Sequence, residues 1–148
     1  MNSLIIGVDS NVLCYALDPA YPEHHKLNGL LLGLSTQNML AVNPTVIHEA
    51  YHALVFGQKW LPEEGRLRLG LLLKHPFILF YSQTKRTCIV ALNIASKYGC
   101  GGRDSLILAN FLLNKIPIVY SHDDELLKLK KVSWKESSVE LKDPLSSR

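Results

Sequence analysis

The chain has 148 residues, of which 47% are hydrophobic and 20% are charged, and its formal net charge is +3 at pH 7. This length and composition exclude a disordered, collagen-like or disulfide-stabilised chain, so we expect one globular domain over residues 1–148. No apolar run approaches the ~20 residues that cross a bilayer, and the N-terminus lacks a secretory signal, so we expect a cytoplasmic protein. Three cysteines without a C-x-x-C pair argue against a disulfide framework and a cysteine-rich zinc site.

The charges are unevenly distributed along the chain. Residues 1–58 hold one base and four acids, residues 59–103 hold eight bases and two acids, and residues 104–148 hold seven of each. A domain with an acidic first part and a basic middle part could place a cation site beside a surface that attracts phosphate. On charge alone, solvent-exposed helix faces are the simpler interpretation.

The apolar residues predict alternating strands and helices. In chain order, we expect a strand at 4–8, helices at 11–17 and 22–34, a weaker strand at 39–42, helices at 44–56 and 62–74, a strand at 77–81, helices at 84–98 and 104–114, a strand at 116–120 and an edge strand at 139–141. This alternation is typical of βαβ units. The sequence therefore predicts a three-layer α/β/α fold with a central, mostly parallel sheet of four to five strands.

Four acidic residues occupy positions that indicate a shared site. Asp9 directly follows the first strand and Asp123 follows the strand at 116–120, where ligands bind in open parallel sheets. Asp104 opens a helix, and Glu49 lies inside an otherwise apolar helix, where a charge is costly unless it is paired or bound to a cation. If the four carboxylates converge, their repulsion requires a counter-ion, and an all-oxygen shell selects Mg²⁺ or Mn²⁺.

Each of these acids also has a purely structural interpretation. Asp9 and Asp104 are favourable N-cap residues for the helices that they precede, and Glu49 could lie on an exposed stripe of its helix. Ser121 and Asp124 match a capping box, which would make Asp124 structural and leave its neighbour free for chemistry. The two adjacent aspartates could exchange these roles.

Four short segments combine strands, helices and acids in a characteristic order. They are residues 5–13 (IIGVDSNVL), 46–50 (VIHEA), 104–109 (DSLILA) and 119–123 (VYSHD). In this combination the sequence resembles the PIN-domain ribonucleases, most closely the VapC-type toxins of prokaryotic toxin–antitoxin pairs. The fourth segment departs from the family pattern, because it has a serine where threonine is common.

The resemblance implies a metal-dependent endoribonuclease with one or two Mg²⁺ or Mn²⁺ ions. The metal-binding and catalytic residues would be Asp9, Glu49, Asp104 and Asp123. In a supporting role, Asn11 and Ser121 would orient these acids or a bound water, with Asp124 as the structural acid beside them. A bound divalent ion suits this chemistry, because it lowers the pKa of its water and neutralises charge on the phosphate.

The resemblance also suggests binding partners. The basic middle of the chain is a candidate for the RNA contact, through Arg66, Arg68, Lys85 and Arg86, and such binding would depend steeply on salt. Relatives commonly form homodimers, and many are paired with an antitoxin, whose peptide would cover the acidic cleft and present an arginine to it. A PIN-like module that binds RNA or protein without cleaving is an alternative, although it would not need all four acids.

A rival motif overlaps the second segment. His48, Glu49 and His52 read H-E-x-x-H, in which two histidines one helical turn apart bind zinc and the glutamate acts as a general base. The extended motif fails, because Val55 and Gln58 occupy the positions of its glycine and third histidine. A zinc peptidase would also leave the three aspartates unexplained.

Overall fold

The computed structural model describes residues 3–146, which form a six-stranded sheet in the order β3-β2-β1-β4-β6-β5. The strands are β1 (Leu4–Val8), β2 (Asn38–Val42), β3 (Ile78–Phe80), β4 (Ile118–Tyr120), β5 (Lys131–Trp134) and β6 (Ser137–Lys142). Neighbouring strands are parallel except for the β5–β6 pair, which is antiparallel. The mixed α/β fold with a central, mostly parallel sheet confirms the prediction from the sequence.

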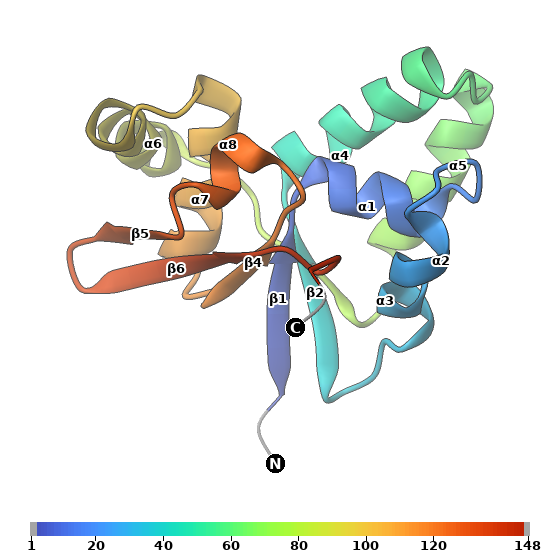
Figure 1. The fold of residues 1–148 in the computed structure, drawn as a ribbon, viewed down its shortest axis with the longest axis horizontal. Helices are drawn as coiled ribbons and strands as arrows, with labels where there is room; N and C mark the ends of the chain where they lie inside the picture. The colour runs from blue at the N-terminus through green and yellow to red at the C-terminus, as the bar shows by residue number, and fades with distance from the viewer. Residues whose placement is uncertain (1–2, 147–148) are drawn as a thin grey trace.

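Helices surround this sheet (Figure 1), with α6 to α8 on the left of the central strands in that view and α1 to α5 on the right. They are α1 (Ser10–Leu17), α2 (His24–Leu27), α3 (Gly29–Leu32), α4 (Pro44–His52), the π-helical segment η1 (Ala53–Gly57), α5 (Pro62–Leu73), α6 (Lys85–Tyr98), α7 (Gly102–Leu113) and α8 (Asp124–Leu127). Within residues 3–146, none of the helices has the length and apolar character that spanning a membrane requires.

The structure corrects the predicted elements at three places. The sheet has six strands rather than four to five, because residues 131–134 form the unpredicted edge strand β5. The strand expected at the edge, β6, instead lies between β4 and β5. The helix expected at 22–34 is divided into α2 and α3, and the helix expected at 44–56 continues beyond α4 as η1.

Two buried contacts fix α7 against the sheet and against α4. The ring of Phe111 covers β1 so closely that a Cβ atom at Gly7 would lie 2.9 Å from it, which explains the glycine. Asn43, the N-cap of α4, donates from Nδ2 to Oδ1 of Asn110 on α7 over 3.2 Å. Asn110 in turn donates to the carbonyl of Tyr81 beyond β3, over 2.9 Å. These contacts set the positions of the two helices that carry Glu49 and Asp104.

Candidate active site

Asp9 lies in the gap between β1 and α1, where its carboxylate is held from two sides. Its Oδ1 accepts a hydrogen bond from the backbone N–H of Val12 over 3.0 Å, which makes Asp9 the N-cap of α1. Its Oδ2 accepts a hydrogen bond from the hydroxyl of Ser121, beyond the end of β4, over 2.5 Å. The capping interpretation of Asp9 is therefore correct, but it uses only one of the two oxygens.

The pKa of Asp9 is raised from 3.8 to about 6, and the largest cause is burial, because the residue is only 4% exposed. The charges of Asp123 and Asp104 contribute to this rise, whereas the hydrogen bonds from Ser121 and Val12 oppose it. A buried carboxylate with two neighbouring negative charges is an environment that a bound cation would relieve.

Asp104 belongs to the first turn of α7, which begins two residues earlier, at Gly102. The N-cap is Gly101, so the interpretation of Asp104 as a cap is wrong. Burial raises the pKa of Asp104, the charges of Asp123 and Glu49 raise it further, and Arg103 opposes them. Asp104 therefore interacts electrostatically with Asp9 and Asp123, beyond the ends of β1 and β4, and with Glu49 on α4.

Glu49 is held in place by one hydrogen bond and one ion pair. Its Oε1 accepts a hydrogen bond from the hydroxyl of Ser10 over 3.3 Å, and its Oε2 lies 3.3 Å from Nε of Arg103. The Glu49 side chain is 20% exposed. It therefore does not lie on an exposed stripe of α4. The sequence does not assign a role to Ser10 or Arg103, and Asn11, from which it predicts the supporting polar contact, is exposed.

Asp123 and Asp124 differ clearly in their surroundings. Asp123 is the N-cap of α8, because its Oδ1 accepts a hydrogen bond from the N–H of Glu125 over 2.9 Å. Its own N–H donates to the Ser121 hydroxyl over 3.0 Å. Asp124 is the first residue of the helix and is exposed. The predicted capping box of Ser121 and Asp124 is wrong, since α8 begins too late for Ser121 to cap it.

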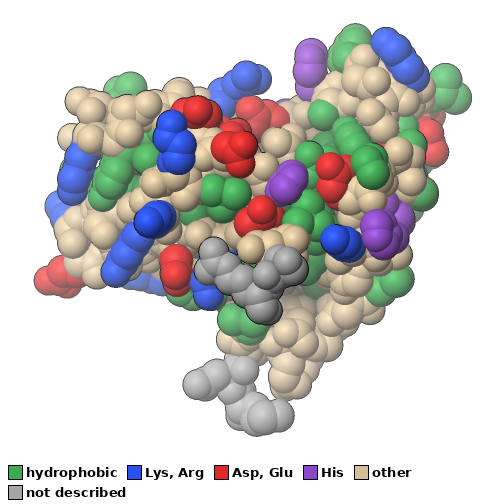
Figure 2. All heavy atoms as spheres, viewed as in Figure 1, with side chains coloured by type: hydrophobic (Ala, Val, Ile, Leu, Met, Phe, Trp, Pro, Cys, Tyr) green, Lys and Arg blue, Asp and Glu red, His purple; other side chains and the backbone are tan. Residues whose placement is uncertain are grey.

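The structure thus brings the four predicted acids, Asp9, Glu49, Asp104 and Asp123, into one neighbourhood. Figure 2 shows several acidic side chains near the middle of the face in view. Within residues 3–146, however, no three acidic, histidine or cysteine side chains lie close enough to hold an ion as they stand. The donor set nevertheless fits a hard divalent ion, because it consists of carboxylate oxygens, and the neighbouring acidic charges raise the pKa of Asp9 and of Asp104.

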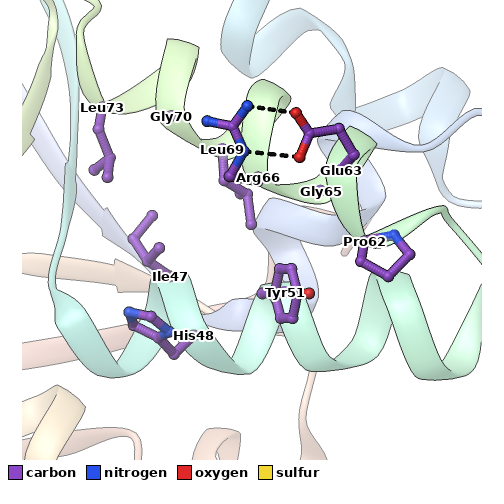
Figure 3. Close-up of a pocket in the computed structure, with 10 residues that line it drawn as sticks. All are labelled: Ile47, His48, Tyr51, Pro62, Glu63, Gly65, Arg66, Leu69, Gly70 and Leu73. Carbon is purple, nitrogen blue, oxygen red and sulfur yellow. Dashed lines mark hydrogen bonds and ion pairs between the residues drawn. The ribbon is translucent and has the colours of Figure 1, made fainter.

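The two histidines of the H-E-x-x-H motif do not share a site with Glu49. His48 lines an apolar groove of about 500 Å³ between α4 and α5, together with Tyr51 (Figure 3). The ring of His52 packs against that of Phe56, with centroids 4.9 Å apart. Glu49 instead contacts Ser10 and Arg103, so the zinc motif is not assembled.

The four predicted acids, Asp9, Glu49, Asp104 and Asp123, are called the acidic cluster below. The four bases predicted to contact RNA do not line it. Arg66 forms an exposed ion pair with Glu63 beside the α4–α5 groove (Figure 3). Arg68 donates to the carbonyl of Leu17 over 3.0 Å, which is an internal contact. Lys85 and Arg86 begin α6, whereas Asp104 lies near the other end of this helix, because α7 follows α6 after a short loop.

Arg103 does lie at the cluster, through its ion pair with Glu49. The sequence offers one signal for Arg103, since this residue directly precedes Asp104, the first residue of the third segment.

Comparisons with known proteins agree on the fold. A family model described as the PIN domain matches residues 6–132. No curated protein matches the sequence significantly. Among solved structures, VapC20 of Mycobacterium tuberculosis, described as a sarcin-ricin loop cleaving toxin, has a TM-score of 0.67 and 13% identity, covering 80% of this chain and 90% of its own.

Two further solved structures cover nearly the whole chain. VapBC2 from Rickettsia felis, bound to a DNA fragment from its promoter, has a TM-score of 0.65 and 15% identity, covering 95% of this chain and 98% of its own. VapBC-1 from nontypeable Haemophilus influenzae has a TM-score of 0.64 and 17% identity, covering 97% and 100%. At these identities the similarity establishes the fold, and function has to be argued from the site.

Proposed function

The chain belongs to the PIN domain family, and on that premise we propose that it is a metal-dependent endoribonuclease that hydrolyses phosphodiester bonds in RNA. The observation that carries the proposal is the buried carboxylate of Asp9, whose pKa burial and the neighbouring Asp123 and Asp104 raise to about 6. Keeping this buried carboxylate ionised at neutral pH costs stability, so we infer that it serves a ligand.

In this proposal the four acids of the cluster together bind the divalent ion. Asp9 and Asp104 supply oxygen ligands from β1 and α7, and Asp123 and Glu49 complete the set from the start of α8 and from α4. One or two Mg²⁺ or Mn²⁺ ions, when bound, would activate water and neutralise charge on the scissile phosphate.

The surrounding hydroxyl groups determine how the acids are presented. Ser121 binds one oxygen of Asp9 and leaves the other on the N–H of Val12, so this carboxylate cannot rotate freely. Ser10 restrains Glu49 in the same manner, over 3.3 Å. Such restraint keeps the carboxylates in a fixed arrangement before substrate arrives, which is what electrostatic catalysis requires.

We further propose that the protein is the toxin of a toxin–antitoxin pair. One similar structure is described as a toxin that cleaves the sarcin-ricin loop, and two others are VapBC proteins. The partner would be an antitoxin protein that covers the acidic cluster, and the place of action would be the cytoplasm, where the RNA lies. Exposed apolar side chains such as Leu32, Ile89 and Leu92 offer surface for the homodimer that we also propose.

The first experiment is cleavage of total RNA by the purified protein with Mg²⁺ or Mn²⁺, beside EDTA and an Asp104→Asn variant. We expect cleavage that requires the ion and is absent in the variant. Glu140→Gln is the matched control, because it removes an exposed carboxylate on β6 outside the cluster. No cleavage by folded, inhibitor-free wild-type protein, combined with RNA binding, would indicate the non-catalytic module instead.

A further inference from the structure

Arg103 occupies a position that is unfavourable for a cation. It is the second residue of α7, where the positive end of the helix dipole favours acidic side chains. Its side chain is 79% exposed, so burial of its apolar part does not explain the placement. When a residue breaks a local rule without an evident gain in packing, a functional reason is the natural inference.

The contact that Arg103 makes is with an acid of the proposed site. Its Nε lies 3.3 Å from Oε2 of Glu49, the oxygen that Ser10 leaves unoccupied. Its charge also opposes the rise in the pKa of Asp104 that burial and the neighbouring acids cause. Among the ion pairs within residues 3–146, this pair alone involves one of the four cluster acids.

A divalent ion and the guanidinium of Arg103 compete for the same negatively charged group, the carboxylate of Glu49. The Arg103 side chain is mostly solvated, and an exposed ion pair of this kind is weak, so an ion at the cluster can displace it. Glu49 itself is 20% exposed and already oriented by Ser10, so it remains in place when the arginine leaves.

We propose, resting on the function proposed above, that Arg103 pairs with Glu49 in the ion-free protein and is displaced from it by the divalent ion. Arg103 thereby lowers the affinity of the cluster for the ion. The released guanidinium stays on α7 next to Asp104, and its planar set of donors suits the oxygens of an RNA phosphate.

The test is calorimetric titration of the full chain with Mn²⁺, in the wild type and in Arg103→Gln. We expect Arg103→Gln to bind Mn²⁺ roughly two- to five-fold more tightly, which corresponds to the loss of one exposed ion pair. Lys128→Gln is the matched control, because Lys128 lines the same hollow as Asp104 but pairs with Glu125 at 3.7 Å. We expect no change in Mn²⁺ affinity in this control.

A double variant separates competition at Glu49 from a general effect of charge. In a Glu49→Gln background, Arg103→Gln should no longer change the affinity for Mn²⁺. The inference is overturned if Arg103→Gln binds Mn²⁺ as the wild type does, or gains affinity equally with and without Glu49. Either result leaves the proposed nuclease function intact. A folded wild type that binds no Mn²⁺ would instead overturn the proposed metal dependence, and this inference with it.

Discussion

The hydroxyl of Ser121 donates a hydrogen bond to Oδ2 of Asp9 over 2.5 Å, which joins the ends of the adjacent parallel strands β4 and β1. This bond opposes the effect of burial, because it favours the ionised form of Asp9. Ser121 is fully buried, so its hydroxyl cannot find water in place of Asp9.

We expect Ser121→Ala to raise the pKa of Asp9 above its value of about 6. The ionised fraction of Asp9 at neutral pH would fall, and the rising limb of the pH profile of RNA cleavage would move upward by about one pH unit. Carbon-13 NMR titration of the Asp9 carboxyl in EDTA measures the pKa directly. Ser121→Thr keeps the hydroxyl and should restore the wild-type profile; identical profiles for the wild type and Ser121→Ala would contradict this role.

The raised pKa of Asp9 also has a consequence for stability. Because the folded protein binds this proton more tightly than the unfolded chain, the contribution of Asp9 is present at low pH and is lost as the pH rises from about 4 to about 6. In EDTA above pH 7, we therefore expect Asp9→Asn to be more stable than the wild type by about 3 kcal/mol. Urea unfolding at several pH values measures this difference, which should shrink toward pH 4.

The same variant separates stability from function. Asn can still accept the hydrogen bond from Val12 and can bond to the Ser121 hydroxyl, so the N-cap of α1 persists. Mn²⁺ should stabilise the wild type against urea but not Asp9→Asn, because Asp9 is a ligand of the ion in the proposed function. A variant less stable than the wild type at neutral pH would show that ionised Asp9 supports the fold.

The sequence predicted the parts of the site that depend on strand ends. Asp9 and Asp123 follow β1 and β4, and the parallel pairing of these strands brings the two acids to one edge of the sheet. Glu49 is recognisable because a charge interrupts an apolar helix. These signals are local, because each depends only on the residues of one strand or helix and those next to it.

The sequence could not predict contacts that depend on how helices pack. Ser10 rather than Asn11 contacts Glu49, since the phase of α1 relative to α4 decides which residue faces the acid. The bases Lys85 and Arg86 are far from Asp104. They lie at the start of α6, whereas Asp104 lies just beyond its end, in the first turn of α7, which packs against α6. Neither fact is encoded in spacing along the chain.

The strand β5 was missed for a different reason. Its four residues include only Val132 as a fully buried side chain, so they carry too little apolar pattern to indicate a strand. Pairing with β6 stabilises β5, and β6 in turn pairs with β4. A strand whose stability comes from its neighbour is recognisable only after the sheet is assembled.

The assignment of the fourth acid can be decided by two adjacent substitutions. Asp123→Asn should keep the N-cap of α8, since asparagine accepts the hydrogen bond from Glu125 equally well. It removes a charge from the cluster, so we expect RNA cleavage to fall by about 100-fold or more. Asp124→Asn changes an exposed side chain and should cleave as the wild type does. Equal losses in both variants, or a loss confined to Asp124→Asn, would contradict the assignment.

Asp18 is a buried carboxylate that joins the end of α1 to the segment between η1 and α5. Its Oδ2 accepts hydrogen bonds from Nε1 of Trp60 over 3.0 Å and from Nε2 of Gln58 over 3.3 Å. The guanidinium of Arg68 lies 4.4 Å from the centre of the Trp60 ring. These contacts hold α5 and the segment that precedes it against the end of α1.

Trp60→Phe removes the indole donor and keeps an aromatic ring for Arg68. We expect the free energy of unfolding to fall by about 1–3 kcal/mol, because a buried carboxylate loses one of its hydrogen bonds. Urea denaturation measures the change, and Mn²⁺ affinity should stay at the wild-type value, because all four cluster acids are intact. Arg66→Ala is the control on the same helix as Arg68, since its ion pair is fully exposed and its loss should not move the urea midpoint. If Trp60→Phe unfolds at the wild-type urea concentration, then Gln58 and the N–H of Ala20 suffice to satisfy Asp18, and Trp60 does not fasten this segment.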